Sequence, residues 1–197
     1  MGRWGPDARG PLEQAALELC LQRGFEQVTV SEIAQRAGFS ERTFYRHFAD
    51  KPEVLFMGMG YLQANVVGLV ANAPTAAVPM EAVIAAFEQA GAVFQENAEV
   101  LRRRQGVVDT HPELRARELS KVAALAEAIA EALRRRGAAD PEAVLVAEAG
   151  TLAFRLAYAG WIRHTGQHDW PRLFRRTLEE IGGVIAGAVT HMAPGET

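Results

Sequence analysis

The chain has 197 residues, of which 49% are hydrophobic and 23% are charged, as in an ordinary globular protein. The formal net charge of −3 excludes the strongly basic balance that by itself indicates nucleic-acid binding, so any such surface has to be a local patch. The single cysteine, Cys20, excludes an intramolecular disulfide and a cysteine-based zinc site. Because the sequence has neither an apolar run of about 18 residues nor a secretory signal, we expect a cytoplasmic protein with no membrane partner.

Helical signals run through nearly the whole sequence, and no stretch alternates with period two, so we predict an all-α protein of about nine helices. Gly24 and Gly38 are suited to end the first two helices, and Ser40 is suited to cap the third. Asp50 with Pro52 signals the start of the fourth. The predicted helices cover residues 11–23, 31–37, 41–48, 51–70, 80–96, 98–108, 112–136, 141–164 and 170–192.

The second and third predicted helices have the pattern of a helix-turn-helix. Ile33, Ala34 and Ala37 lie on the inward face of the first helix of the pair. The two alanines are small enough to let the second helix approach closely, and Gly38 stands where the chain must reverse. Two short helices joined in this way can cross at a steep angle, so residues 24–55 predict a DNA-binding motif.

The third predicted helix separates apolar from basic side chains. Phe44 and Phe48 are four residues apart and mark its buried side, while Arg42 and Arg46 fall nearly opposite Phe44. Arginine can pair bidentately with guanine in the major groove, and Thr43 can meet a thymine methyl group or a phosphate. The exposed face of this helix therefore offers groups that read base edges.

Phosphate contacts are expected from residues beside that face. Tyr45 and His47 are suited to phosphate contacts, which orient a helix without reading sequence. Lys51 would place its charge beside the free backbone N–H groups at the start of the next helix. Alternatively, Tyr45 and His47 only cap a small three-helix core. The first 51 residues hold seven basic and seven acidic residues, so local net charge favours neither interpretation.

The segment resembles the DNA-binding domain of the TetR family of transcriptional regulators. The positions that carry the resemblance are Thr29, Val30, Ile33, Ala34, Ala37, Gly38, Phe39, Ser40, Tyr45, His47, Phe48, Lys51 and Leu55. Phe39 replaces a small aliphatic residue of the pattern, and Glu41 adds an anion beside the DNA face. The DNA contacts that the resemblance implies are Thr29, Ser40, Arg42, Thr43, Tyr45, Arg46, His47 and Lys51.

The resemblance also implies two domains with different functions. Residues 1–55 would form an N-terminal arm and a three-helix DNA-binding domain, and residues 56–197 a helical ligand-binding and dimerisation domain. The expected function is a ligand-responsive repressor that binds a palindromic operator as a homodimer and is released by a small apolar or amphipathic inducer. A transcriptional activator of the same fold is the alternative within the family.

The last two predicted helices carry apolar stripes that suit a dimer interface. Small residues beside these stripes would allow close approach, and in the family such helices form a four-helix interface with those of a partner. A single intramolecular core is the alternative explanation for the same pattern. The expected interface residues are Leu152, Leu156, Trp161, Leu178, Ile181 and Ile185.

The middle helices are expected to line the cavity of a small-molecule effector, although the same residues would also make an ordinary core. The candidate lining residues are Phe87, Phe94, Leu101, Arg104, Leu125, Ile129 and Tyr158. The run from His111 to Arg117 resembles the C-terminal domain of mycofactocin-type TetR regulators. This resemblance implies an acyl-CoA effector, with its chain in an apolar channel and its phosphates on arginines.

Other classes of function fit the sequence less well. A Gly-rich phosphate loop and the common hydrolase and metalloprotease motifs are lacking, so we expect no enzyme and no cofactor. Thr165 and Gly166 interrupt the helix between His164 and His168, which with Asp169 form the one His/carboxylate cluster, so we expect no metal site. A helical protein-interaction module remains an alternative, but it would need no arginines on the exposed face of the third helix.

Overall fold

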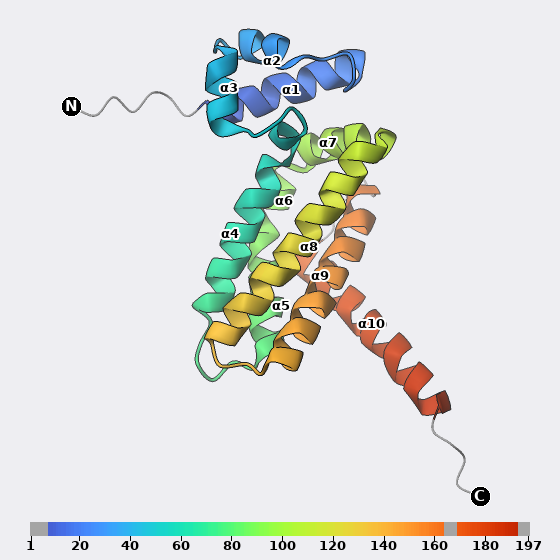
Figure 1. Ribbon diagram of the computed structural model, residues 1–197. Helices are drawn as coiled ribbons and strands as arrows, with labels where there is room; N and C mark the ends of the chain where they lie inside the picture. The colour runs from blue at the N-terminus through green and yellow to red at the C-terminus, as the bar shows by residue number, and fades with distance from the viewer. Residues whose placement is uncertain (1–7, 164–168, 193–197) are drawn as a thin grey trace, which may run out of the picture. The chain divides into compact units, whose positions relative to one another are not determined.

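The structure, a computed structural model, describes residues 8–163 and 169–192 (Figure 1). These residues form ten α-helices and one 3-10 helix, and they include no β-strand. In chain order the elements are α1 (Arg9–Arg23), α2 (Val30–Arg36), α3 (Glu41–His47), η1 (Pro52–Phe56), α4 (Met57–Ala71), α5 (Pro79–Ala90), α6 (Ala92–Glu96), α7 (Ala98–Thr110), α8 (Pro112–Arg135), α9 (Asp140–Arg163) and α10 (Trp170–Met192). The all-α prediction is confirmed.

The chain forms two compact units. Unit 1 consists of Met1–Leu62 and Glu99–Lys121, and unit 2 consists of Gln63–Ala98 and Val122–Thr197. Unit 1 therefore extends beyond residue 55 and includes α7 and the first part of α8. The division of the chain into residues 1–55 and 56–197 stays a prediction about its functional domains.

The core of unit 1 is built from the inward faces of its short helices. Phe44 of α3 and Ile33 of α2 are fully buried, as is Leu12 of α1. Val108 of α7 and Leu114 of α8 belong to the same cluster, so a segment far along the chain completes this small core. Burial of these side chains is what holds α1, α2 and α3 together, since helices of seven residues are not stable alone.

The predicted caps set the ends of the first three helices. Gly24, which ends α1, and Gly38, which lies between α2 and α3, have positive φ angles of 83° and 77°, a conformation that favours glycine. The hydroxyl of Thr29 accepts from the backbone N–H of Glu32, whose carboxylate accepts from the backbone N–H of Thr29 in return. Ser40 caps α3 by accepting from the backbone N–H of Thr43.

Unit 2 packs α9 against α5 and α10. Its interior is a cluster of aromatic rings with centroids 4.9 to 6.1 Å apart. The rings in this cluster are Phe87, Phe94, Phe154, Tyr158, Trp161, Trp170 and Phe174. Gly150 of α9 lets α5 approach, because a Cβ at this position would lie 2.5 Å from a methyl group of Val83.

Two helices differ from their predicted form. The predicted helix over residues 51–70 begins as the 3-10 helix η1 and becomes α-helical only at Met57. The predicted helix over residues 80–96 is broken at Gly91 into α5 and α6. The break accommodates Trp170: a Cβ on Gly91 would lie 1.8 Å from its ring, and its indole N–H donates to the carbonyl oxygen of Phe87 at 2.8 Å.

Two segments, Pro52–Ala71 and Asp140–Arg163, are long and apolar enough to span a membrane by length and composition alone. The second of these is α9, which buries one stripe of side chains against α5 and α10, as a core helix does. Length and hydropathy therefore carry little weight as evidence of a membrane segment in this chain.

Candidate DNA-binding surface

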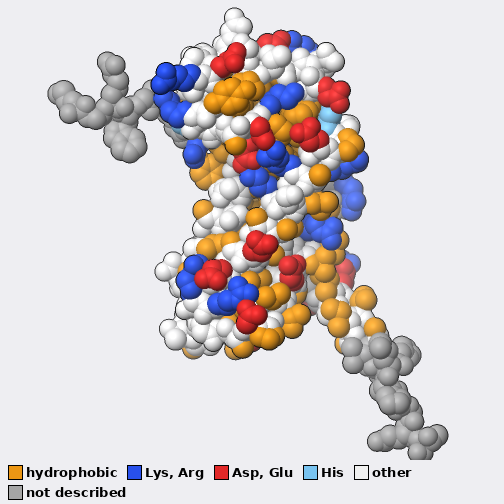
Figure 2. All heavy atoms as spheres, viewed as in Figure 1, with side chains coloured by type: hydrophobic (Ala, Val, Ile, Leu, Met, Phe, Trp, Pro, Cys, Tyr) orange, Lys and Arg blue, Asp and Glu red, His pale blue; other side chains and the backbone are white. Residues whose placement is uncertain are grey.

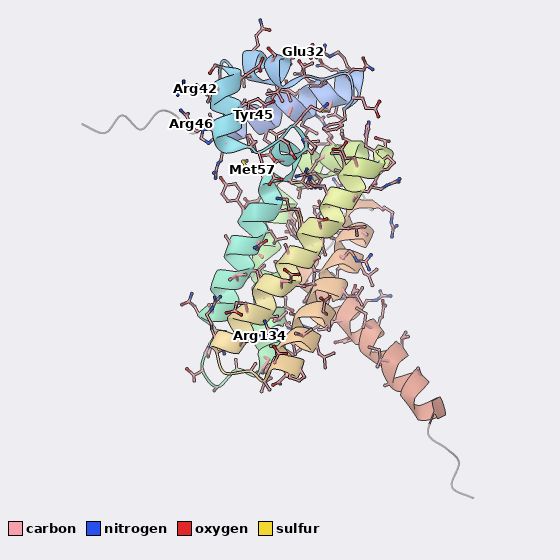
Figure 3. The ribbon with its side chains drawn as sticks, viewed as in Figure 1. Glu32, Arg42, Tyr45, Arg46, Met57 and Arg134 are labelled. Carbon is pink, nitrogen blue, oxygen red and sulfur yellow. The ribbon has the colours of Figure 1, made fainter. Side chains whose placement is uncertain are left out.

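The face of α3 that lies opposite the core is basic. Phe44 is fully buried and Phe48, which follows the helix, is nearly so, whereas Arg42, Tyr45 and Arg46 are exposed. Arg42 and Arg46 are one helical turn apart and project from the same side of α3 (Figure 3). The structure therefore brings these two guanidinium groups together on a surface that is open to a ligand.

The charges on α1, α2 and α3 separate into paired and unpaired groups. Arg23 forms an ion pair with Glu32 at 2.8 Å, and Arg36 forms one with Glu18 at 2.7 Å. Neither Arg42 nor Arg46 forms an ion pair within the described part of the chain; Arg46 lies 3.4 Å from the ring nitrogen of His47. Residues 1–51 are neutral as a sum, yet the two arginines of α3 form no ion pair with any carboxylate of the described residues.

The paired carboxylates are held in their charged form. The hydrogen bond from Arg23, with further bonds from the backbone and hydroxyl of Thr29, lowers the pKa of Glu32 to about 2. Hydrogen bonds from Arg36 and Gln14 also lower the pKa of Glu18. These carboxylates stay ionised at neutral pH, so their arginine partners remain compensated.

Thr29, Ser40 and Thr43 have local hydrogen-bond partners. Thr29 and Ser40 are the N-cap residues of α2 and α3, and the hydroxyl of Ser40 lies 3.2 Å from that of Thr43. Both of these N-cap residues are exposed. Their role as DNA contacts stays a prediction, and their capping role is independent of it.

Lys51 already has hydrogen-bond partners within unit 1, and its role as a phosphate contact stays a prediction. Its ammonium group donates to the carbonyl oxygens of Phe25 and Val28, each at 2.9 Å, and lies 4.1 Å from the centre of the Phe25 ring. The side chain therefore holds the loop between α1 and α2. A phosphate contact by Lys51 would compete with two hydrogen bonds that the protein already makes.

The predicted dimer residues differ in how far they are buried. Leu152, Leu156 and Ile185 are exposed, and Leu178 and Ile181 are half-buried. Trp161, in contrast, is 2% exposed and belongs to the aromatic cluster of unit 2, so its ring packs against Phe94 and Tyr158 rather than lying on the surface.

The predicted ligand-lining residues belong to different units. Phe87, Phe94 and Tyr158 are part of the aromatic cluster of unit 2, and Leu125 and Ile129 of α8 are fully buried in that unit. Leu101 and Arg104 lie in unit 1. The guanidinium of Arg104 donates to the carbonyl oxygen of Leu55 at 2.7 Å and to Glu118 at 2.9 Å, so its charge is already compensated within the protein.

Sequence reasoning missed one polar network in unit 1. Asp50 and Glu53 bind Arg117 and Lys121 of α8, and no local pattern links positions so far apart in the chain. The capping box of α2 could have been found, because Thr29 and Glu32 have its characteristic spacing.

Two further residue groups were considered for other chemistry. Of the cluster that we expected not to bind a metal, His164 and His168 lie outside the described residues. Cys20 is buried, which raises the pKa of its thiol to about 11.

Comparison with known proteins supports this geometry at both ends of the chain. Residues 13–56 match the model of the bacterial regulatory proteins of the tetR family, and residues 77–186 match that of the MftR C-terminal domain. The chain is 35% identical over 79 residues to the HTH-type transcriptional regulator TcmR of Streptomyces glaucescens, covering 40% of this chain and 35% of TcmR. It is 31% identical over 126 residues to MftR of Mycobacterium tuberculosis, which is named for mycofactocin biosynthesis regulation, covering 64% of this chain and 63% of MftR.

A solved structure gives the same fold along most of the chain. FadR of Thermus thermophilus, a TetR family transcriptional repressor crystallised with lauroyl-CoA, superposes with a TM-score of 0.53 at 25% identity, covering 87% of this chain and 91% of FadR. The curated relatives named above match over less than two thirds of their own length, whereas this structural match is nearly complete. The MftR C-terminal domain model matches more than half of this chain, and the tetR family model matches its helix-turn-helix region. The chain therefore belongs to the TetR family of DNA-binding transcriptional regulators and carries an MftR-type C-terminal domain.

Proposed function

We propose that the protein is a ligand-responsive transcriptional repressor that binds a palindromic operator as a homodimer. The observation that carries the proposal is the pair of uncompensated arginines on the exposed face of α3. Arg42 and Arg46 read guanines in the major groove, and Tyr45 and His47 contact phosphates beside it. A helix-turn-helix of this size reads only a few base pairs, so two copies are needed for a specific site.

The dimer is proposed to form through α9 and α10. Val184 and Ile185 of α10 are 75% and 58% exposed, and the second half of the helix extends beyond the other helices of unit 2 (Figure 1). Hydrophobic side chains lie along its described part (Figure 2). An isolated apolar helix end of this kind is unfavourable in water, and a symmetric four-helix contact with a partner would bury it.

The effector is proposed to be a small apolar or amphipathic molecule bound among the helices of unit 2, with acyl-CoA as the first candidate. Two observations support this class. The C-terminal domain is of the MftR type, and FadR of Thermus thermophilus, with the same fold, holds lauroyl-CoA. Binding would shift α4, which continues directly from η1, and thereby change the separation of the two recognition helices so that the dimer leaves its operator.

Selection of bound duplexes from a random DNA pool tests the proposal and requires no assumed operator sequence. We expect a palindromic consensus with half-sites about one helical turn apart, bound by two protomers as judged by sedimentation. Addition of lauroyl-CoA should release the duplex. A monomer that selects no consensus would contradict the proposal, and a reporter gene downstream of the selected site distinguishes repression from activation.

A further inference from the structure

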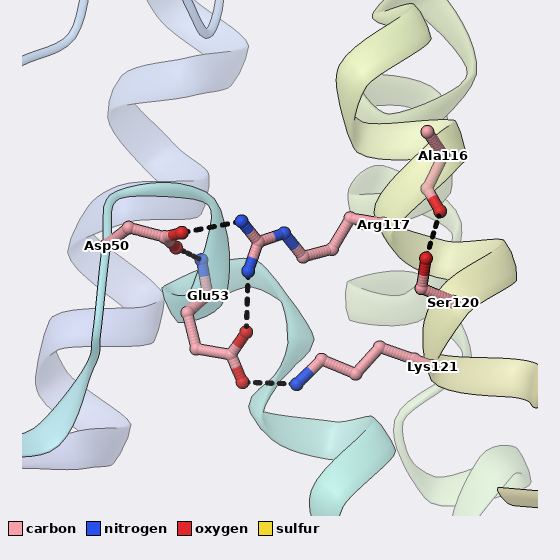
Figure 4. Close-up of polar contacts among 6 residues, drawn as sticks. All are labelled: Asp50, Glu53, Ala116, Arg117, Ser120 and Lys121. Atoms are coloured by element: carbon pink, nitrogen blue, oxygen red, sulfur yellow. Dashed lines mark hydrogen bonds and ion pairs between the residues drawn. The ribbon is translucent and has the colours of Figure 1, made fainter. Parts of the chain in front are cut away.

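The segment Asp50–Phe56, which follows the recognition helix α3, is held by polar contacts from α8. The backbone N–H of Glu53 donates to Oδ1 of Asp50 at 2.9 Å, which closes the turn into η1. The second oxygen of Asp50 accepts from Nη2 of Arg117 at 2.5 Å (Figure 4). One carboxylate therefore caps the turn and also ties it to α8.

Glu53 adds two contacts on the same side of the segment. Its Oε2 accepts from Nη1 of Arg117 at 3.3 Å, and its Oε1 accepts from Nζ of Lys121 (Figure 4). Arg117 thus bridges Asp50 and Glu53, and Lys121, one helical turn further, holds Glu53 alone. The four side chains are only partly exposed, so solvent screens their charges less than it screens surface pairs.

The far end of the segment is held by α7. Arg104 is 8% exposed, and its Nε donates to the carbonyl oxygen of Leu55 at 2.7 Å. The guanidinium also lies 4.7 Å from the centre of the Phe56 ring and donates to Glu118 of α8 at 2.9 Å. Both ends of η1 are therefore bound to the helical pair α7 and α8, within unit 1.

This arrangement bears on the recognition helix because the connection is short. Phe48 is the C-cap of α3, and only Ala49, Asp50 and Lys51 separate it from η1. Lys51 is fixed to the loop between α1 and α2, while Asp50 is fixed to Arg117. Three residues with anchors on both sides leave the end of α3 little freedom.

We propose that Arg117 and Lys121 are positioning residues for DNA binding. They hold Asp50 and Glu53, and through them the end of α3, in the arrangement that fits the operator. They are not proposed to contact DNA themselves, because these carboxylates compensate their charges. The inference rests on the proposed function, because it assumes that α3 reads DNA.

The test compares substitutions in one helix that remove the same charge. Arg117→Gln and Lys121→Gln break the contacts, whereas Arg134→Gln removes a cation of α8 that pairs with Asp140 and Glu131 in unit 2 (Figure 3). We expect affinity for the selected duplex to fall about tenfold for Arg117→Gln, about threefold for Lys121→Gln and less than about twofold for Arg134→Gln, as measured by fluorescence anisotropy.

The salt dependence of binding separates positioning from direct contact. A residue that neutralises a phosphate changes the slope of log K against log salt by about 1 when it is removed. We expect the slope of Arg117→Gln to equal that of Arg134→Gln, because neither residue contacts a phosphate. A reduced slope for Arg117→Gln would overturn the proposal in favour of a phosphate contact.

A reversed pair controls for loss of folding. Glu53→Lys should weaken binding, and the addition of Lys121→Glu to it should restore part of the affinity, because it re-forms one ion pair with reversed charges while Arg117 still faces the new cation. If Arg117→Gln does not fold, this pair decides the question alone, and an absence of rescue would overturn the inference. A wild-type chain that selects no duplex overturns the proposed function itself, whereas wild-type affinity in Arg117→Gln and in the Glu53→Lys variant overturns only the positioning role.

Discussion

The charged side chains of unit 1 and the aromatic side chains of unit 2 differ in how easily a functional site can be identified among them. In the first three helices of unit 1, ion pairs compensate Arg23 and Arg36, whereas Arg42 and Arg46 of α3 form no ion pair within the described residues. In unit 2 the aromatic rings that could line an effector site pack on one another instead. The proposed DNA-reading surface therefore differs from its surroundings in its unpaired charges, whereas an effector site built from core residues cannot be distinguished from the core by composition.

Loss of the Trp170 ring should have the largest effect on stability. Trp170 is fully buried between Phe94 and Phe174 and donates a hydrogen bond to the carbonyl oxygen of Phe87. We expect Trp170→Ala to lower the free energy of unfolding by about 3 to 5 kcal/mol, measured by urea denaturation at fixed protein concentration. Trp170→Phe should cost less, since it keeps a ring. A loss below about 1 kcal/mol for Trp170→Ala would mean that this ring is not a core element of unit 2.

Two glycine-to-alanine substitutions should change stability in opposite directions, and this tests the packing around Trp170. A Cβ on Gly91 would collide with the ring of Trp170, whereas a Cβ on Gly106 of α7 would meet nothing within 4 Å. We expect Gly91→Ala to destabilise by about 1 to 3 kcal/mol and Gly106→Ala to stabilise by about 0.5 to 1 kcal/mol. Equal effects in thermal unfolding would show that the break between α5 and α6 does not depend on Trp170.

In unit 1, Thr29 should contribute to stability whether or not it touches DNA. Thr29→Ala removes the two hydrogen bonds that the hydroxyl makes with Glu32, including the one that caps α2, and should cost about 1 kcal/mol, whereas Thr29→Ser keeps the capping oxygen. Denaturation of the free protein measures this difference. If both substitutions leave stability unchanged, the hydroxyl is available to DNA and the capping role is unimportant.

The smallest effect is expected from the ion pair of Glu32. The pKa of Glu32 is lowered to about 2, so its contribution is present above the pKa of the unfolded chain, about 4.3, and is lost as the pH falls toward 2. We expect the melting temperature of the wild type to fall more steeply than that of Glu32→Gln between these limits. Parallel curves would show that this carboxylate is not specially stabilised in the folded state.

The helical fold was predictable because its signals are local. Gly24, Gly38 and Ser40 end or begin helices through their own backbone or side-chain chemistry, and the structure places them as predicted. The break at Gly91 was not predictable, because its cause is the ring of Trp170 on a helix far along the chain. Local patterns contain no information about such a partner.

The candidate site shows the same limit. Helical periodicity predicted that Arg42 and Arg46 lie opposite Phe44, and burial of Phe44 with exposure of both arginines confirms it. A count of charges could not show which arginines are compensated, because Arg36 of α2 forms its ion pair with Glu18 of a different helix, α1. Lys51 was expected to face a phosphate, but the nearby carbonyl oxygens of Phe25 and Val28 already accept its hydrogen bonds.

The most direct test of the central claim compares four single substitutions that each remove one positive charge. The paired arginines are changed in Arg23→Gln and Arg36→Gln, and the unpaired ones in Arg42→Gln and Arg46→Gln. Affinity for the selected duplex should fall at least about tenfold for each unpaired arginine, with a lower salt slope where a phosphate contact is lost, and less than about threefold for each paired one. Equal losses for all four substitutions would contradict the assignment of DNA reading to the uncompensated face of α3.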